Sequence, residues 1–201
     1  MIIGERGQKI PADVIEAYKG VAPATIGHIS GARVMTSAIK PGYSRCKVVG
    51  QAFTVRSIGL DITATSKACE LIEAGEVMVV DRAGDVEHAC IGEFRALDQQ
   101  KKGVVGWIID GASTDILACA DIQFPIFARS WSALVGQALN SSTGYVNGTI
   151  VCGGVVVNPG DLIVADDDGV AVLTPGEAVE HLEHCLEVEA RETRKRLEYQ
   201  K

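Results

Sequence analysis

The chain has 201 residues, is 47% hydrophobic and 22% charged, contains 22 glycines, and carries a formal net charge of −7 at pH 7. This length suffices for one well-buried domain but not for two large ones, and the composition excludes disordered and fibrous proteins. The negative charge argues against a nucleic-acid partner, and no apolar run approaches the roughly 18 residues of a membrane span.

Residues 1–9 lack an apolar signal core and a small-residue cleavage site, which predicts a cytoplasmic protein. The six cysteines are scattered along the chain, with about twenty residues or more between neighbours, and they form no CxxC pair. Such cysteines are typical of small buried side chains, not of disulfides or a zinc site.

The first two thirds of the chain predict alternating helices and strands. Residues 11–18 have helical periodicity behind a proline, and a second helix begins near Ala22. The expected elements that follow are a strand over 47–56, a helix over 64–74 closed by Gly75, a strand over 77–80, a helix over 93–102 closed by Gly103, a strand over 104–109, a short helix over 116–120 and a strand over 126–128. This alternation is typical of an α/β fold.

Hairpins replace the alternation in the last third of the chain. Residues 149–157 predict a two-strand unit around Gly153-Gly154. A turn at Pro159-Gly160 leads into a strand over 162–165, and a turn at 166–169 leads into a strand over 170–173. Alternation followed by hairpins favours a single layered domain.

The chain ends in a predicted helix from Pro175 to about Tyr199. One thin apolar stripe runs along it, formed by Val179, Leu182, Leu186 and Ala190. This surface looks too small to fold the helix onto its own domain, so we expect it to pack across a subunit boundary. The predicted organisation is one domain over residues 1–201, with peripheral helices in about 1–45 and the long helix at about 175–199.

Two acidic residues bracket one helix–strand unit. Gly92-Glu93-Phe94-Arg95 opens the helix, an apolar strand returns to Asp110-Gly111, and Thr114-Asp115 follows, with twenty residues between Glu93 and Thr114. Two carboxylates held at one sheet edge can bind a divalent cation. From the residues alone, Asp115 is equally well explained as the cap of the helix that starts at Ile116, and Glu93 as an acid that favours the helix dipole.

The spacing resembles the acid-X20-Arg-Asp motif of the metal-dependent 4-hydroxy-4-methyl-2-oxoglutarate aldolases, which are closely related to the inhibitor of ribonuclease E, RraA. The resemblance extends from about Ala12 to Glu177. Its further landmarks, in order, are 76–81 with Gly84-Asp85, 106–111, 124–129 and 159–169. The resemblance implies an RraA-like fold, with layered β/β/α architecture of the swivelling-domain type.

The resemblance also implies roles for the bracketing residues. Asp115 would bind the metal, Mg²⁺ or Mn²⁺ on oxygen ligands, and Asp115 and Glu93 would be the catalytic pair. Gly92, Glu93, Phe94, Arg95 and Thr114 would bind the substrate, whose carboxylate suits the free N–H groups at the start of the helix. Glu93 would transfer a proton through a bound water.

Thr114 departs from the motif, where an arginine pairs with a substrate oxygen. Loss of one such charged donor typically costs about 3–4 kcal/mol of transition-state stabilisation. Arg95 or Arg129 is a candidate to supply a guanidinium from another direction. Otherwise the site binds a different substrate or has lost its chemistry.

The function that the resemblance implies is a divalent-metal-dependent carbon–carbon lyase acting on small pyruvate-type 2-oxo acids. Aldol cleavage and oxaloacetate decarboxylation both fit, because both release a pyruvate enolate. The implied assembly is a homotrimer or dimer of trimers, with Glu189 or Glu192 of a neighbouring helix reaching the site, and with no nucleic-acid or membrane partner. The alternatives are a non-catalytic protein-binding regulator similar to the ribonuclease E inhibitor, and an isomerase that uses the same enolate.

Overall fold

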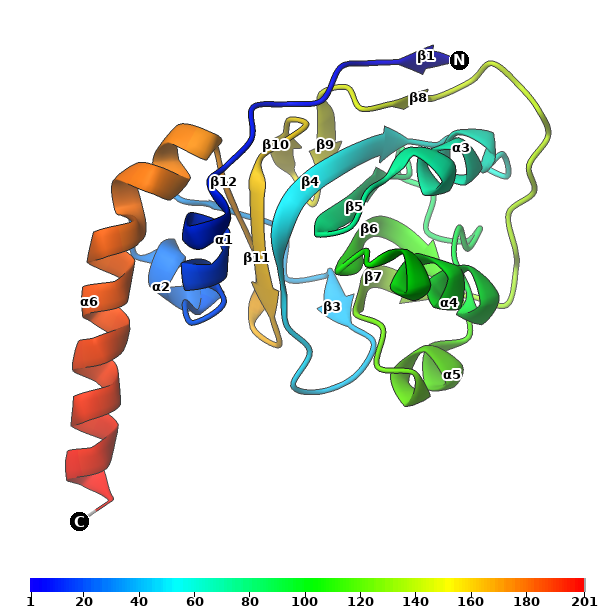
Figure 1. Cartoon of the computed structure of the whole chain (residues 1–201). Helices are drawn as coiled ribbons and strands as arrows, with labels where there is room; N and C mark the ends of the chain where they lie inside the picture. Colours follow the sequence, from blue (N-terminus) through cyan, green and yellow to red (C-terminus); the bar gives the residue numbers. More distant parts are fainter. Residues whose placement is uncertain (201) are drawn as a thin grey trace.

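The computed structural model describes residues 1–200, and a curled sheet lies at its centre (Figure 1). The middle of the sheet consists of four parallel strands, which are β4 (Val48–Arg56), β5 (Glu76–Asp81), β6 (Gly106–Ser113) and β7 (Ile126–Trp131). Beyond β4 the sheet continues with the antiparallel pair β11 (Leu162–Asp166) and β12 (Gly169–Leu173), in the order β2-β12-β11-β4-β5-β6-β7-β3.

Side chains of the central strands alternate between two buried faces. Trp107 and Ile109 of β6 pack under the helices α3 (Thr63–Leu71), α4 (Glu93–Lys102) and α5 (Ile116–Asp121), whereas Ile108 joins the core below the hairpin of β9 (Ile150–Cys152) and β10 (Val155–Val157). All three side chains are fully buried. Burial on both faces explains why this strand reads as one continuous apolar run. These layers confirm the predicted β/β/α fold.

A third core lies at the other end of the sheet. There α1 (Ala12–Tyr18), α2 (Pro23–Gly27) and α6 (Pro175–Tyr199) pack beside β11 and β12. Four strands of two residues each were not predicted, because two residues carry no periodicity. They are β1 (Ile2–Ile3), β2 (Arg33–Val34), β3 (Lys40–Pro41) and β8 (Tyr145–Val146).

Three predicted boundaries are wrong by three residues or more. β7 ends at Trp131 and not at residue 128. α3 ends at Leu71 and Ile72 is already extended, so Gly75 does not close the helix. β6 continues through Asp110-Gly111 to Ser113, with a bulge between Ile109 and Ala112. At this bulge the Arg82 side chain crosses Gly111. It passes so close that a Cβ on residue 111 would collide with Arg82 Cγ. By contrast, α4 has its predicted bounds, and Gly103 ends it with a left-handed φ of 84°.

The expectation that α6 lacks the surface to fold onto its own domain is also wrong. The helix starts with a capping box between Thr174 and Glu177 and buries Ala178, Cys185 and Val188. Tyr18 Oη donates to the Ala178 carbonyl at 3.0 Å. The buried face is not the predicted stripe, because Val179, Leu186 and Ala190 remain exposed.

All six cysteines are unpaired, as expected from their spacing, and only Cys69 is not fully buried. Among residues 1–200, no helix is both long enough and apolar enough to cross a membrane.

Candidate active site

The two bracketing acids meet at the edge of the sheet where the parallel strands end. The segment before α4 lies alongside the end of β6, because Cys90 N donates to the Ala112 carbonyl at 3.2 Å and Thr114 N donates to the Ile91 carbonyl at 3.0 Å. These bonds set Gly92 beside Asp115. The carboxyl ends of parallel strands are where α/β folds commonly bind ligands.

Asp115 is exposed and adopts a left-handed backbone conformation, with φ 56° and ψ 40°. This conformation is uncommon for residues other than glycine, although aspartate tolerates it better than most. Asp115 occupies the position before α5, yet its side chain makes no capping bond to that helix. Its Oδ2 instead accepts the backbone N–H of Glu93 at 3.0 Å. The carboxylate therefore joins the start of α4, and the interpretation of Asp115 as a simple cap of α5 fails.

Gly92 leaves room for this carboxylate. Its backbone is extended, which any residue adopts, but a Cβ there would collide with Asp115 Oδ2 and lie 2.9 Å from Thr114 Cγ2. The glycine is required by this close approach and not by its backbone angles.

Replacing Gly92 with alanine is therefore expected to displace the carboxylate while the fold persists. If the site catalyses the reaction that the resemblance implies, its turnover should fall by about a hundredfold, the usual cost of misplacing a catalytic group by about 1 Å. Steady-state kinetics and thermal unfolding measure the two effects. Gly27→Ala is the matched control, because a Cβ at Gly27 meets nothing within 4 Å. Equal turnover of Gly92→Ala and wild type would refute the steric argument.

Neither candidate arginine reaches the acids. Arg95 donates to the Cys90 carbonyl at 3.2 Å and to Ser66 Oγ at 3.1 Å, so it joins α4 to the preceding loop and to α3. Arg129 pairs with Asp110 at 2.5 Å, and Asp110 also accepts the Gly153 N–H. Among the described residues, neither guanidinium bonds to Glu93 or Asp115. The structure thus gives no support to a substitute arginine from within the chain.

The remaining predicted site residues lie around the pair. Glu93 is half-buried at the first position of α4, and Thr114 Oγ1 lies 3.5 Å from Asp115 Oδ1. Phe94 is 79% exposed and Leu117 of α5 is 78% exposed. Both side chains lie in the first turns of the two site helices.

Sequence reasoning missed Cys119, which lies under the acids. Its backbone N–H donates to the Asp115 carbonyl at 2.9 Å. Burial, together with the negative charges of Asp115 and Glu93, raises the pKa of the Cys119 thiol to about 11. The thiol is therefore protonated at neutral pH and is not a nucleophile there.

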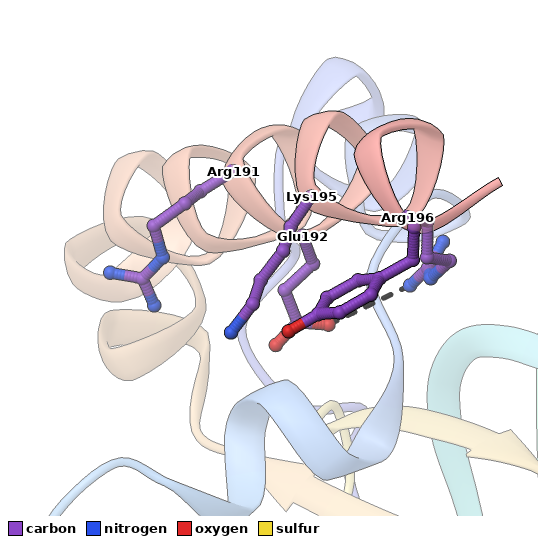
Figure 2. A pocket seen from close by; sticks show the side chains of 5 residues that line it. Arg191, Glu192, Lys195 and Arg196 are labelled. Carbon is purple, nitrogen blue, oxygen red and sulfur yellow. Dashed lines mark ion pairs between the residues drawn. The ribbon is translucent and has the colours of Figure 1, made fainter. Parts of the chain in front are cut away.

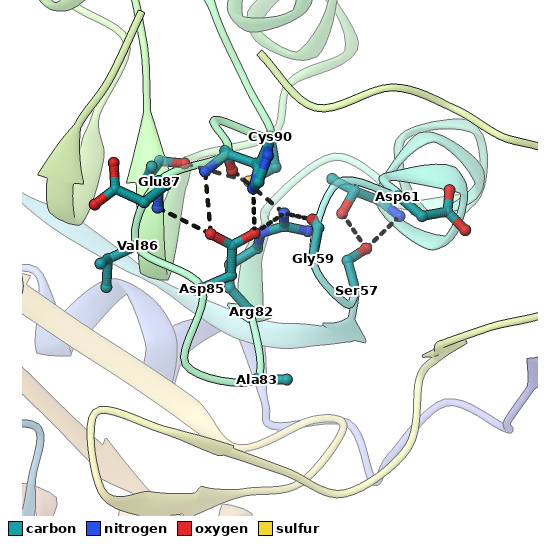
Figure 3. Close-up of polar contacts among 12 residues, drawn as sticks. Ser57, Gly59, Asp61, Arg82, Ala83, Asp85, Val86, Glu87 and Cys90 are labelled. Carbon is teal, nitrogen blue, oxygen red and sulfur yellow. Dashed lines mark hydrogen bonds and ion pairs between the residues drawn. The ribbon is translucent and has the colours of Figure 1, made fainter. Parts of the chain in front are cut away.

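Sequence reasoning also missed a buried cation beneath the loop that leads to Gly92 (Figure 3). Arg82 is fully buried, and its Nη2 donates to the Gly59 carbonyl at 2.5 Å and to the His88 carbonyl at 3.3 Å. Asp85 Oδ2 lies 3.3 Å from the same nitrogen and 2.9 Å from His88 Nδ1. Burial alone would raise the pKa of Asp85, but the N–H groups of Glu87 and His88 and these two side chains lower it. The network ties the β4–α3 loop to the β5–α4 loop.

Arg82→Met is expected to destabilise the protein by about 3 kcal/mol, because it removes one partner of a buried ion pair and leaves two loop carbonyls without their donor. Urea unfolding measures the change. Lys67→Met is the control, since Lys67 forms an exposed pair with Glu70 that contributes less than about 1 kcal/mol. A loss for Arg82→Met no larger than that of the control would contradict a structural role for the network.

The donor groups at this sheet edge determine which metal ion could bind there. Within residues 1–200 no three His, Cys, Asp or Glu side chains converge as a ready ligand set. Asp115 offers an exposed carboxylate beside Glu93, and Mg²⁺ commonly binds through one or two carboxylates while it keeps several waters. The donors therefore fit a hard cation that the substrate and water help to ligate, and they do not fit a closed structural site.

Comparisons with known proteins identify the family of the chain. The model of the RraA-like family, described as Aldolase/RraA, matches residues 12–172. A protein of Halalkalibacterium halodurans named "Putative 4-hydroxy-4-methyl-2-oxoglutarate aldolase" is 36% identical over 166 residues, which cover 82% of this chain and 78% of that protein.

Solved structures of the family are similar as well. Streptomyces coelicolor RraAS2, described as an unusual member of the RNase ES inhibitor RraA protein family, has a TM-score of 0.82 at 25% identity and covers 94% of this chain and 100% of its own. The RNA-processing inhibitor RraA from Thermus thermophilus has a TM-score of 0.65 at 25% identity, over 72% of this chain and 86% of that one. The chain therefore belongs to the RraA-like family.

Proposed function

We propose that this chain is a divalent-metal-dependent lyase that breaks a carbon–carbon bond in pyruvate-type 2-oxo acids. The observation that carries the proposal is the exposed Asp115 carboxylate, held against the start of α4 by the Glu93 N–H at 3.0 Å. A helix cap requires no such contact with a second helix. The name of the Halalkalibacterium halodurans relative, which is that of an aldolase, supports the same reaction class.

Each part of the site has a distinct task in this reaction. Asp115 would hold Mg²⁺ or Mn²⁺, and the bound ion would supply positive charge for the enolate oxygen. The backbone N–H groups of Phe94 and Arg95 lie in the first turn of α4, where no earlier carbonyl of the helix accepts them, so they suit the substrate carboxylate. The 2-oxo acid would thus lie across the start of α4.

Glu93 would move the proton. In aldol cleavage it would accept the proton of the 4-hydroxyl group as the C3–C4 bond breaks, and then return it to the pyruvate enolate. In oxaloacetate decarboxylation carbon dioxide leaves, and Glu93 would pass a proton from solvent water to the pyruvate enolate. One carboxyl group beside the metal ligand therefore serves both reactions.

The assembly is part of the proposal. We expect a homotrimer or a dimer of trimers in which a neighbouring copy covers Phe94 and Leu117. Of the two acids that the resemblance assigns to a neighbouring site, Glu189 is already engaged, because it accepts from Ala22 N at 2.8 Å and from Thr25 Oγ1 at 2.6 Å. Glu192 is exposed and makes only a 3.6 Å ion pair with Arg196, so it is the acid that is free to reach across.

A turnover assay tests the reaction class. Oxaloacetate and 4-hydroxy-4-methyl-2-oxoglutarate should be consumed in the presence of Mg²⁺ or Mn²⁺, with pyruvate as product, and EDTA should stop the reaction. Absence of turnover with every 2-oxo acid and both metals would favour the second candidate, a non-catalytic protein-binding regulator. The observations that favour that candidate are Thr114 and the similarity to the Thermus RNA-processing inhibitor.

A further inference from the structure

The loop that follows β7 borders the acid pair and carries no charge. Ser132 N donates to the Ser113 carbonyl at 2.9 Å, which sets the loop beside the end of β6. Ala89 N donates to the Leu134 carbonyl at 2.8 Å, which sets it beside the segment that precedes α4. Residues 130–146 contain no aspartate, glutamate, histidine, lysine or arginine. The loop therefore brings no ionic group to this edge of the sheet.

Apolar side chains are exposed on three elements around the acid pair. Phe94 lies in the first turn of α4, Leu117 in the first turn of α5 and Leu134 in the uncharged loop. Thr114 turns its methyl group toward Gly92, since a Cβ on that glycine would lie 2.9 Å from Thr114 Cγ2. The groups that surround the two carboxylates are therefore uncharged and mainly apolar.

No positive charge of the same chain lies at this edge to balance a second substrate carboxylate. Among residues 1–200, no lysine or arginine side chain bonds to Glu93 or Asp115. The pKa of the Cys119 thiol beneath them is raised by both carboxylates and lowered by no cation. The basic side chains in Figure 2 belong to the last turns of α6, which lies across the molecule from α4 and α5 in Figure 1.

We propose that the side of the site bounded by Phe94, Leu117 and Leu134 binds an apolar group on C4 of the substrate, so that the preferred 2-oxo acids carry one carboxylate and not two. The inference rests on the proposed function, which sets that carboxylate at the start of α4. Glu93 and Asp115 match the charge of one divalent cation, so a second carboxylate would be desolvated without a positive partner. An apolar group instead gains by leaving water for contact with exposed hydrophobic side chains.

The products of cleavage follow from this preference. As the C3–C4 bond breaks, its electron pair stays with the pyruvate enolate, and C4 becomes the carbonyl carbon of an apolar aldehyde or ketone. The proton of the 4-hydroxyl group passes to Glu93 and then to C3 of the enolate, so no further reactant is needed. The reaction therefore releases pyruvate and an uncharged carbonyl compound.

Two isosteric analogues that cannot be cleaved test the preference without requiring turnover. In 6-methyl-2-oxoheptanoate an isopropyl group replaces the terminal carboxylate of 2-oxohexanedioate, and neither compound has the 4-hydroxyl group that cleavage requires. Calorimetric titration in the presence of Mn²⁺ should give an affinity for the apolar analogue at least about tenfold higher than for the diacid. The 4-hydroxy forms of the two compounds should differ in kcat/KM in the same direction.

A guanidinium introduced into the apolar side should reverse the preference. Leu117→Arg should bind the diacid at least about tenfold more tightly than the apolar analogue, because the second carboxylate gains a charged partner. Leu134→Arg, on the neighbouring loop, should act in the same direction. Leu197→Arg adds the same charge to an exposed leucine near the end of α6 and should keep the wild-type ratio of affinities. Thermal unfolding checks that each variant folds.

Tighter binding of the diacid to wild type would overturn the proposal, as would an unchanged ratio of affinities in both Leu117→Arg and Leu134→Arg. If the diacid preference of wild type disappears in Arg191→Met/Lys195→Met, then α6 of a neighbouring copy supplies the cation that the proposal denies. Preference for the apolar analogue without turnover of its 4-hydroxy form would support the apolar subsite and refute only the proposed reaction. Binding of neither analogue with Mn²⁺ present would refute both.

Discussion

Asp115→Asn should lower metal-dependent turnover by at least about a thousandfold, because asparagine keeps the size of the side chain but loses the charge that holds the cation. The fold should persist, with a change in unfolding free energy within about 1 kcal/mol, since Asp115 is exposed and asparagine tolerates its left-handed backbone.

Steady-state kinetics and calorimetric titration with Mn²⁺ check this expectation, and urea unfolding provides the stability control. Asp121→Asn is a matched variant at the other end of α5, and it should change neither the turnover nor the affinity for Mn²⁺. An Asp115→Asn protein that binds Mn²⁺ as tightly as wild type would refute the assignment of Asp115 as the metal ligand.

Thr114→Arg should raise oxaloacetate decarboxylation by about a hundredfold, the usual contribution of one preorganised charged donor. The reason is that Arg95 and Arg129 are committed to Cys90, Ser66 and Asp110, so the described chain supplies no guanidinium to the acids. Thr114 is partly exposed and lies next to Asp115, which gives an arginine there access to a substrate oxygen.

The ratio of kcat/KM for the variant and for wild type measures this gain. Thr114→Met adds comparable length without charge and should give no increase. The opposite result would be an unchanged or lower kcat/KM for Thr114→Arg together with a strongly reduced kcat/KM for Arg95→Ala. It would mean that Arg95 rearranges to bind the substrate and that the site does not lack a guanidinium.

Local signals in the sequence predict that the two acids lie at one sheet edge, whereas their roles come from the family resemblance. Gly92 and Gly103 delimit α4, and an acid stands at each end of one helix–strand unit, so chain connectivity alone brings Glu93 and Asp115 to the same sheet edge. The continuous apolar run of β6 likewise predicts a strand that is buried on both faces.

Other features depend on contacts that no local pattern encodes. The direction of the Arg95 side chain is set by Ser66 of α3, nearly thirty residues away. Arg82 is a charged residue at a strand exit, where solvent exposure is the usual outcome, and it is buried only because Gly59, Asp85 and His88 surround it. The predicted apolar stripe of α6 is present but exposed, because α1 and α2 pack against the neighbouring face of the helix.

The central claim is that Asp115 and the start of α4 form one site for a metal and a 2-oxo acid. It is tested most directly by measuring whether a metal ion and an enolate mimic strengthen each other's binding. Oxalate has the charge and shape of a pyruvate enolate, so calorimetry should show that Mn²⁺ tightens oxalate binding by at least about tenfold, with the reciprocal effect of oxalate on Mn²⁺. Both effects should vanish in Asp115→Asn. Oxalate affinity that is the same with and without Mn²⁺ would contradict the claim.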